Sequence, residues 1–195
     1  MHINTIIRNY YYLSKVKKVS PNYLDFEIDK LTNSIENVIS GEVFDTAITQ
    51  LHTTDHLQIK KADWIFNWQN ELKDTTKKVY KLTTINNPKI IHGLTSLTDK
   101  SDHIFMDLIE NAKFNKGKHK LYHGVAGNLV AFACKMSFEL KYDGIVSFIA
   151  KTPLIAHYQQ TLGAKLFNNN RMFIDSRESL VLVTNYFKDF NYGKL

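Results

Sequence analysis

The chain has 195 residues, of which 44% are hydrophobic, and it carries a formal net charge of +6. A chain of this length can form one globular domain with a substantial core. It contains no apolar run long enough to span a membrane and no apolar stretch typical of a secretory signal, so we expect a cytoplasmic protein without membrane contacts. The only cysteine, Cys134, excludes a disulfide framework and a thiolate zinc site within one chain.

The positive charge comes almost entirely from lysines spread along the chain, because Arg8, Arg171 and Arg177 are the only arginines. Proteins that bind nucleic acids usually concentrate arginine on one face. We therefore expect a solvated basic surface, and we do not expect a nucleic acid as the partner.

The N-terminal part of the chain is expected to contain an extension, a strand and helical pieces. Residues 1–20 show no clear period and are assigned to an N-terminal extension, ahead of a single domain over residues 21–195. Apolar residues alternate over residues 24–28, which predicts a half-buried strand. Over residues 35–51 and 62–72 the apolar spacing is i, i+3, i+4, which predicts helices.

Three strands should follow and form an antiparallel set. They are predicted over residues 79–85, 89–97 and 102–112, and a turn at Asn86-Asn87-Pro88 joins the first two. The apolar spacing then predicts an amphipathic helix over residues 128–142.

The C-terminal part alternates between strands and helices. An almost wholly apolar strand is predicted over residues 145–150, followed by a helix that starts at Thr152-Pro153 and stops at Leu162-Gly163. Residues 165–174 read as a hairpin. The spacing of residues 175–178 is that of a capping box and predicts a terminal helix that ends near Phe187.

The turn Gly124-Val125-Ala126-Gly127, between a predicted strand and a predicted helix, has the residues of an anion cradle. Small residues let the backbone approach a ligand closely, and the free amides at a helix start favour a phosphate. The chain has neither a G-x-G-x-x-G motif in an N-terminal βαβ unit nor a G-x-x-x-x-G-K-[ST] motif, which excludes the usual dinucleotide and P-loop sites.

The order of these elements resembles that of the GNAT superfamily of N-acetyltransferases, which bind acetyl-CoA. The resemblance covers roughly residues 79–167. Residues 106–112 are similar to the family's central strand, Gly124-Val125-Ala126 to the glycine part of its pyrophosphate loop, and residues 154–164 to its later N-x-x-A-x-x-x-Y segment. Tyr158 falls at the position of the family's usual proton donor.

The resemblance implies an α+β fold with a GNAT-like mixed, mostly antiparallel and splayed sheet flanked by helices. The cofactor would enter between the strands around Leu108 and Phe148. The implied reaction is transfer of an acetyl group from acetyl-CoA to a primary amine of an unknown acceptor by direct attack. Monomer and homodimer both stay open.

The resemblance also implies roles for single residues. Tyr158 would protonate the leaving CoA thiolate, although it also fits an ordinary core residue on the apolar face of its helix. Asp107 and Glu110 are the candidate bases, and strand alternation predicts that they lie on opposite faces, so that only one faces the acceptor. The residues expected to bind acetyl-CoA are Leu108, Ile109 and Glu110 on the strand, Lys116 and Lys118 with Lys120 in the loop, and Gly124, Val125, Ala126, Gly127 and Asn128 in the cradle.

A catalytically inactive GNAT-like module that contacts nucleic acid or a protein partner is the alternative. It stays open because Leu121 stands where the family's loop has Arg or Gln, and because Gly163 lies five residues after Tyr158 instead of four.

Two histidine pairs have the i, i+4 spacing of metal ligands on a helix, His52 with His56 and His119 with His123. Neither pair brings an obvious third ligand, so no metal site is expected.

Overall fold

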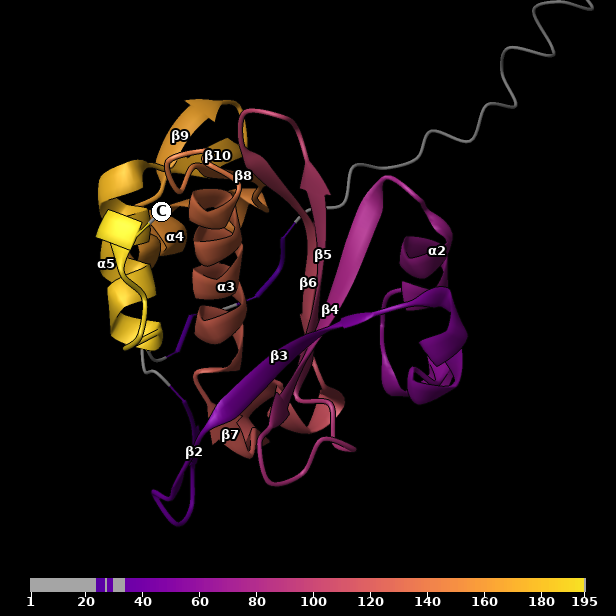
Figure 1. Cartoon of the computed structure of the whole chain (residues 1–195). Helices are drawn as coiled ribbons and strands as arrows, with labels where there is room; N and C mark the ends of the chain where they lie inside the picture. The colour runs from indigo at the N-terminus through magenta and orange to yellow at the C-terminus, as the bar shows by residue number, and fades with distance from the viewer. Residues whose placement is uncertain (1–23, 27, 30–33, 195) are drawn as a thin grey trace, which may run out of the picture.

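The computed structural model describes residues 24–26, 28–29 and 34–194, and the extension expected over residues 1–20 lies outside them. Its main feature is a seven-stranded sheet of order β3-β4-β5-β6-β8-β10-β9 (Figure 1). All neighbours in this sheet are antiparallel except β6 and β8, which are parallel. The strands, in sheet order, are Thr46–Leu51, Lys77–Thr84, Gly93–Asp99, Ile104–Asn111, Val146–Ile149, Arg171–Ile174 and Lys165–Asn168.

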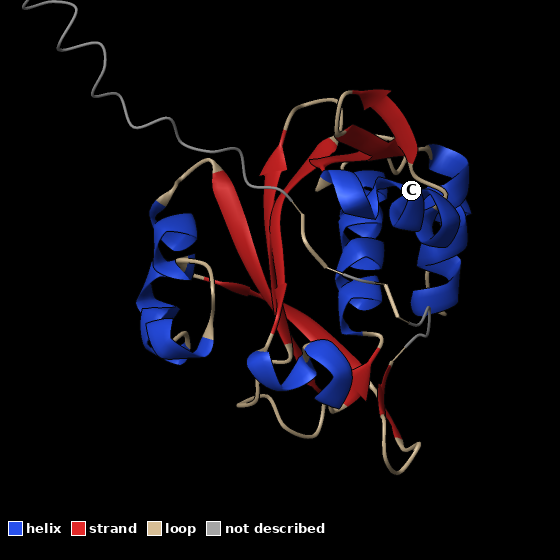
Figure 2. Cartoon of the chain, turned by 180° about the vertical axis from the view of Figure 1, so that it is seen from behind, coloured by secondary structure: helices blue, strands red, loops and turns tan. Residues whose placement is uncertain are grey.

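Helices cover both faces of this sheet. On one side lie the 3-10 helices η1 (Thr53–Gln58) and η2 (Lys61–Asp63) and the helix α2 (Trp68–Lys73). On the other side lies α3 (Val125–Glu139), with α5 (Ser176–Tyr186) packed against it (Figures 1 and 2). The remaining elements are α4 (Ile155–Leu162) and the 3-10 helices η3 (Lys113–Asn115), η4 (Gly117–His119), η5 (Thr152–Leu154) and η6 (Tyr192–Lys194).

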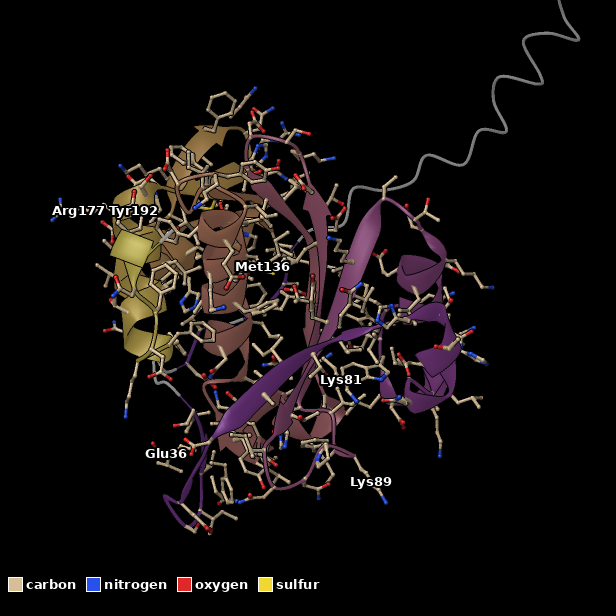
Figure 3. The ribbon with its side chains drawn as sticks, in the orientation of Figure 1. Glu36, Lys81, Lys89, Met136, Arg177 and Tyr192 are labelled. Carbon is tan, nitrogen blue, oxygen red and sulfur yellow. The ribbon has the colours of Figure 1, made fainter. Side chains whose placement is uncertain are left out.

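The two faces of the sheet carry two separate cores. Met136 of α3 packs against the larger core, which also contains Tyr158 and Leu162 of α4 (Figure 3). The smaller core lies under α2 and is built around Trp64 and Trp68, whose rings meet edge to face at 6.2 Å.

The helix expected over residues 35–51 is wrong, because these residues form strands. β1 (Ile35–Asn37) pairs with β2 (Val43–Phe44) and with β7 (Tyr122–His123) in a small three-stranded sheet. The helical spacing was misleading because its members do not share an environment, since Ile35 is buried whereas Ile39 is 87% exposed in the turn. A local pattern cannot tell a core face from a hairpin whose turn carries apolar residues.

The strand predicted over residues 24–28 is wrong, because the described residues there form only an isolated bridge between Leu24 and Ala150. The remaining predicted elements are present, with shifted ends. The three strands β4, β5 and β6 are antiparallel, and residues 165–174 form a hairpin. Asp175 caps α5 by accepting a hydrogen bond from the Glu178 amide at 3.1 Å. The helix predicted over residues 62–72 is confirmed only in its second half, and α3 starts three residues earlier than predicted.

A β-bulge in β6 changes which side chains face which core. Ser96 pairs with Leu108 and Leu97 with Met106, so Asp107 is one extra residue on β6. Because of this residue, Met106 and Ile109 both belong to the core under α3, while Leu108 joins the core under α2.

The parallel pairing between β6 and β8 is short. Within the described residues it covers Ile104–Met106 opposite Val146–Phe148, and the rest of β6 runs on without β8. Where two neighbouring strands separate in this way, an opening forms inside the sheet, and the backbone N–H and C=O groups that face it need other partners. No helix among the described residues is both long and apolar enough to cross a membrane.

Candidate active site

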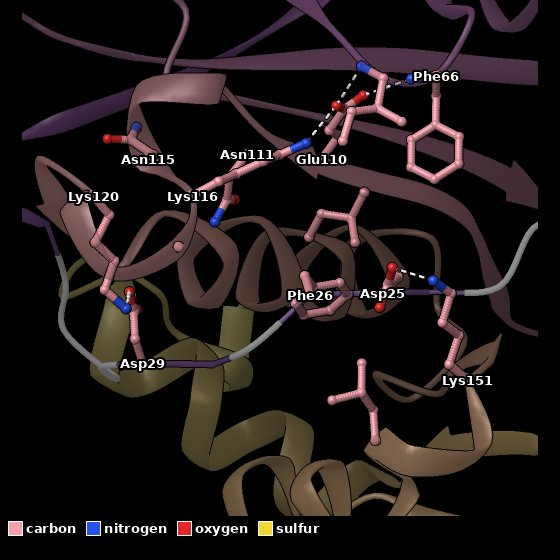
Figure 4. A pocket seen from close by; sticks show the side chains of 14 residues that line it. Asp25, Phe26, Asp29, Phe66, Glu110, Asn111, Asn115, Lys116, Lys120 and Lys151 are labelled. Carbon is pink, nitrogen blue, oxygen red and sulfur yellow. Dashed lines mark hydrogen bonds and ion pairs between the residues drawn. The ribbon is translucent and has the colours of Figure 1, made fainter.

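A cavity of about 550 Å³ lies along the edge of β6, where β8 no longer pairs with it. The side chains of Ile109 and Glu110 point to opposite faces of the sheet, Ile109 to the core under α3 and Glu110 to the loop before α2. Because both residues line the cavity, the cavity runs along the edge of the strand and not on one face of the sheet. The cavity is bounded by the end of β6, by the loop that follows it and by a stretch of chain from the N-terminal part (Figure 4). The lining residues are Asp25, Phe26, Asp29, Ile65, Phe66, Ile109, Glu110, Asn111, Asn115, Lys116, Gly117, Lys120, Lys151 and Leu154.

Glu110, one of the two predicted bases, is a buried anchor for the loop before α2. One carboxylate oxygen accepts from the Ile65 amide at 2.8 Å and from Lys116 at 2.6 Å. The other accepts from the Phe66 amide at 3.2 Å and from the Trp68 indole at 2.7 Å. Both oxygens are therefore engaged, and only the bond from Lys116 comes from a flexible side chain. The role of Glu110 as a base stays a prediction.

Asp107, the other predicted base, lies on the same side of the sheet as Glu110. Its carboxylate accepts from the Thr98 hydroxyl at 2.6 Å and lies 3.5 Å from Lys77, which also pairs with Glu71 of α2 at 2.9 Å. Burial raises the pKa of Asp107. The prediction that Asp107 and Glu110 occupy opposite faces is wrong, because the bulge shifts the alternation by one residue between them.

Tyr158, the predicted proton donor, is fully buried and its ring packs against Phe148 at 5.5 Å. Its hydroxyl donates to the Phe26 carbonyl at 2.8 Å, and the Phe26 amide approaches the same hydroxyl at 3.3 Å. Phe26 lines the cavity, whereas Tyr158 is not among the lining residues and reaches only the backbone of Phe26. Whether Tyr158 donates a proton to a thiolate stays a prediction.

The predicted cradle forms the start of α3. Gly124 is the N-cap and has φ of +88°, a conformation that favours glycine. Val125, Ala126, Gly127 and Asn128 follow in the first turn and are all buried. The Asn128 amide group donates to the carbonyls of Gly124 at 2.8 Å and Ser34 at 3.3 Å.

A carboxylate already occupies the entrance of this cradle. Asp29 accepts from the Gly124 amide at 2.9 Å and lies 3.0 Å from the Lys120 ammonium and 3.2 Å from His123 Nδ1. Burial alone raises the pKa of Asp29, but the bond from Gly124 and the Lys120 charge outweigh it and hold the pKa below its usual value. The turn therefore binds an oxyanion within the chain itself.

The three lysines predicted to contact phosphates lie at different places. Lys116 pairs with Glu110 at 2.6 Å and Lys120 with Asp29 at 3.0 Å, whereas Lys118 is exposed. Two of them therefore already hold carboxylates that line the cavity.

Sequence reasoning missed the polar groups that complete the cavity. The side-chain oxygens of Asn111 and Asn115 are buried and have no hydrogen-bond partner among the described residues. Both residues line the cavity. No motif marks them, and only the structure brings them beside Asp29 and Phe26. Within the described part of the chain, no cluster of His, Cys, Asp and Glu could hold a metal ion.

His92 anchors the loop that carries the three lysines. Its ring lies 5.6 Å from Phe114 and 4.8 Å from Tyr122, and Asn115 donates to its carbonyl at 3.2 Å. The ring is 3% exposed, and burial lowers the pKa of His92 to about 4.

The comparisons with known proteins agree with this geometry at the level of fold. No protein-family model and no curated protein matches the chain. A structure of the AtaT-AtaR complex bound to DNA is 18% identical with a TM-score of 0.52, over 70% of this chain and 98% of its own. A mutant AtaT toxin bound to the C-terminus of the antitoxin AtaR and acetyl-CoA is 13% identical with a TM-score of 0.51, and the match covers 72% of this chain and 99% of the toxin chain. A chimera of spermidine N-acetyltransferase SpeG from Vibrio cholerae and hSSAT is 16% identical with a TM-score of 0.45, and the match covers 69% of this chain and 98% of the chimera.

The two AtaT structures, with TM-scores of 0.51 and 0.52, confirm the predicted GNAT-like fold, a mixed and mostly antiparallel sheet flanked by helices. One of the solved structures contains acetyl-CoA and another contains DNA. For this chain, the expectation that nucleic acid is not the partner stays a prediction.

Replacing Glu110 should destabilise the protein strongly. Glu110→Ala removes the acceptor of four hydrogen bonds and leaves buried donors unsatisfied, so we expect the free energy of unfolding to fall by about 3 kcal/mol or more. The matched control is Glu139→Ala, which removes a surface carboxylate paired with Lys135 and should cost below about 1 kcal/mol. Urea unfolding measures both, and equal losses would contradict the anchoring role.

The buried His92 should make stability depend on pH. Below its ordinary pKa of 6.5 the unfolded chain gains a proton at His92, whereas the folded chain resists protonation down to about pH 4. Stability due to this group is therefore present above pH 6.5 and is lost as the pH falls to 4. The difference between a pKa of 6.5 in the unfolded chain and about 4 in the folded chain corresponds to about 3 kcal/mol in the free energy of unfolding.

The variant His92→Phe keeps a ring between Phe114 and Tyr122 and cannot titrate. Unfolding of parent and variant at several pH values between 7 and 4 isolates the contribution of His92, because all other groups titrate in both. We expect the parent to lose more stability than the variant over this window. Parallel curves would show that the folded protein protonates His92 freely.

Proposed function

We propose that this chain is an N-acetyltransferase that transfers an acetyl group from acetyl-CoA to a primary amine. One observation carries the proposal. The cavity follows the edge of β6 where β8 leaves it, and the turn at one end of the cavity already holds an oxyanion. A long ligand with a phosphate at one end and a reactive group at the other suits such a groove.

The residues in the groove fit acetyl-CoA chemically. Asp29 shows that the Gly124 amide, Lys120 and His123 can together hold a negatively charged oxygen, as a pyrophosphate would require. The unpartnered oxygens of Asn111 and Asn115 need N–H donors, because a buried acceptor without one costs about 1–3 kcal/mol. The pantetheine arm of CoA carries amide N–H groups of this kind.

Acetyl-CoA, when bound, supplies an acetyl group activated as a thioester. In this proposal the first-turn amides of Val125, Ala126 and Gly127 hold its phosphates, with Asn128 fixing the turn, and the backbone of Leu108, Ile109 and Glu110 holds the pantetheine arm. Lys116 and Lys118 add positive charge along the same path. The AtaT structure with acetyl-CoA supports the choice of donor.

The protein's own residues would then move two protons. Transfer forms a bond between the amine nitrogen and the acetyl carbon and breaks the bond from that carbon to sulfur. The Tyr158 hydroxyl gives its proton to the departing sulfur, and a carboxylate takes the proton that the amine loses. Glu110 is the better placed of the two candidate carboxylates because it lines the cavity, whereas Asp107 does not. Release of Lys116 would free one of its oxygens.

Asn111→Leu should separate a binding role from a structural one. The Asn111 side-chain oxygen has no partner to lose among the described residues, so the free energy of unfolding should be unchanged or higher. Binding of acetyl-CoA should weaken about tenfold, because the variant cannot accept a hydrogen bond from the ligand. Calorimetric titration and urea unfolding measure the two effects. Unchanged affinity would remove Asn111 from the site. Absence of acetyl-CoA binding at millimolar concentration in the parent and in the Asp29→Asn variant alike would overturn the proposed function.

Tyr158→Phe should lower turnover without lowering affinity for acetyl-CoA. The change deletes the hydroxyl and keeps the ring against Phe148, and loss of a general acid reduces rates by about a hundredfold or more. Thiol release from acetyl-CoA in the presence of a panel of primary amines measures the rate. Equal rates in the parent and the variant would assign Tyr158 to the core alone.

A further inference from the structure

Part of the N-terminal region forms one wall of the groove and binds groups at both of its ends. This N-terminal segment consists of the described residues 24–26, 28 and 29, and three of its members line the cavity. Figure 4 shows Asp25 beside Lys151, Phe26 in the middle and Asp29 beside Lys120. Each of these residues makes a specific contact with the wall of the groove.

At one end the segment extends the edge of β8. The Leu24 amide donates to the Ile149 carbonyl at 2.7 Å, and the Lys151 amide donates to the Leu24 carbonyl at 3.2 Å, in a parallel bridge at Ala150. The Ala150 amide itself donates to Asn170, which precedes β10. Leu24 therefore sits on the edge of β8 that faces away from β10, the same edge that pairs with β6 further back.

In its middle the segment covers the proposed proton donor. Both the carbonyl and the amide of Phe26 bond to the Tyr158 hydroxyl, and the two rings are tilted by 40° with 5.3 Å between their centroids. The Ile28 amide donates to His157 Nε2 at 2.8 Å. While these bonds hold, the Tyr158 hydroxyl is committed to the chain and cannot protonate a sulfur.

At the other end the segment places a carboxylate on the phosphate cradle. Asp29 accepts from the Gly124 amide at 2.9 Å and lies beside the Lys120 ammonium and His123 Nδ1, three groups that a pyrophosphate at the start of α3 would also use. The order along the segment is thus the order expected along the cofactor, from the reacting end at Tyr158 to the phosphate end at Gly124.

We infer that the N-terminal segment is a tethered competitor of acetyl-CoA, with Asp29 in the place of a phosphate and Phe26 over Tyr158. The inference rests on the function proposed above. The cofactor and the segment use the same donors, so binding of one requires release of the other. The observed affinity is then the intrinsic affinity multiplied by the fraction of molecules in which the segment has left the groove.

Apolar and charged contacts both hold the segment, and they can be changed separately. The ion pair of Asp25 with Lys151 lies at the surface, where such pairs contribute little. Among the described residues of the segment, Leu24, Phe26 and Ile28 hold it by burying apolar side chains, and Asp29 holds it through its charge. Removing the charge of Asp29 should therefore favour binding of acetyl-CoA over binding of the segment, and it leaves the buried apolar residues unchanged.

The test compares the full-length parent with Asp29→Asn and with Asp102→Asn. Asp29→Asn keeps the size of the side chain and removes its charge, and we expect acetyl-CoA to bind about tenfold more tightly. Asp102 is 79% exposed in the turn between β5 and β6, so its substitution removes one negative charge away from the groove and should leave the affinity at the parental value. Calorimetric titration measures all three proteins.

Hydrogen exchange in the parent gives a second readout that needs no substitution. The amides of Leu24, Phe26 and Ile28 all donate hydrogen bonds in the folded chain. If acetyl-CoA displaces the segment, these amides should exchange faster when the ligand is added, whereas a ligand usually slows exchange around its site.

The possible failures of the inference and of the proposed function differ. Equal affinities of Asp29→Asn and Asp102→Asn, or continued protection of the three amides with acetyl-CoA bound, would overturn the inference and leave the proposed function standing. If none of the three proteins binds acetyl-CoA, the proposed function fails and the inference fails with it.

Discussion

The short parallel pairing between β6 and β8 is the constraint on which the rest of the structure depends. The two strands are joined only over Ile104–Met106, and beyond this point each needs other partners for its backbone. Leu24 bonds to the end of β8, and the cavity of about 550 Å³ lies along the free part of β6. A fully paired sheet would have closed this space, so the groove is a direct result of where the pairing stops.

The bulge at Asp107 decides how the two layers of helices are tied to the sheet. The extra residue turns both Asp107 and Glu110 towards α2 and its preceding loop, where one contacts Lys77 and the other contacts Trp68. A buried carboxylate with four donors fixes that loop against β6. The same four hydrogen bonds oppose proton transfer to Glu110, because a carboxylate whose lone pairs all accept hydrogen bonds has none free for the proton of an amine. Stability and the proposed role as a base thus make opposite demands on Glu110, and Lys116 is the one donor on a flexible side chain.

The contacts of Asp29 connect the fold with the proposed chemistry. A helix start attracts negative charge whether it belongs to a ligand or to the chain. Here the chain supplies that charge from a residue 95 positions before Gly124, and it supplies backbone partners for Tyr158 from a residue 132 positions away. The Gly124 amide and the Tyr158 hydroxyl therefore both have hydrogen-bond partners within the chain, so the fold does not leave these buried donors unsatisfied.

The sequence by itself determined the elements whose signals are local. The antiparallel set β4, β5 and β6, the small-residue turn before α3, and the capping of α5 by Asp175 all follow from spacing and turn chemistry within a few residues. From them the element order, and hence the GNAT-like fold and the place of the cradle, could be predicted. Tertiary structure alone decided that residues 35–51 form strands, that one bulge puts Asp107 and Glu110 on one side, and that Asp29 and Phe26 line the groove and bond to Gly124 and Tyr158. The physical reason is that pairings between residues far apart in the chain leave no periodic trace, so only the folded chain shows which polar groups satisfy one another.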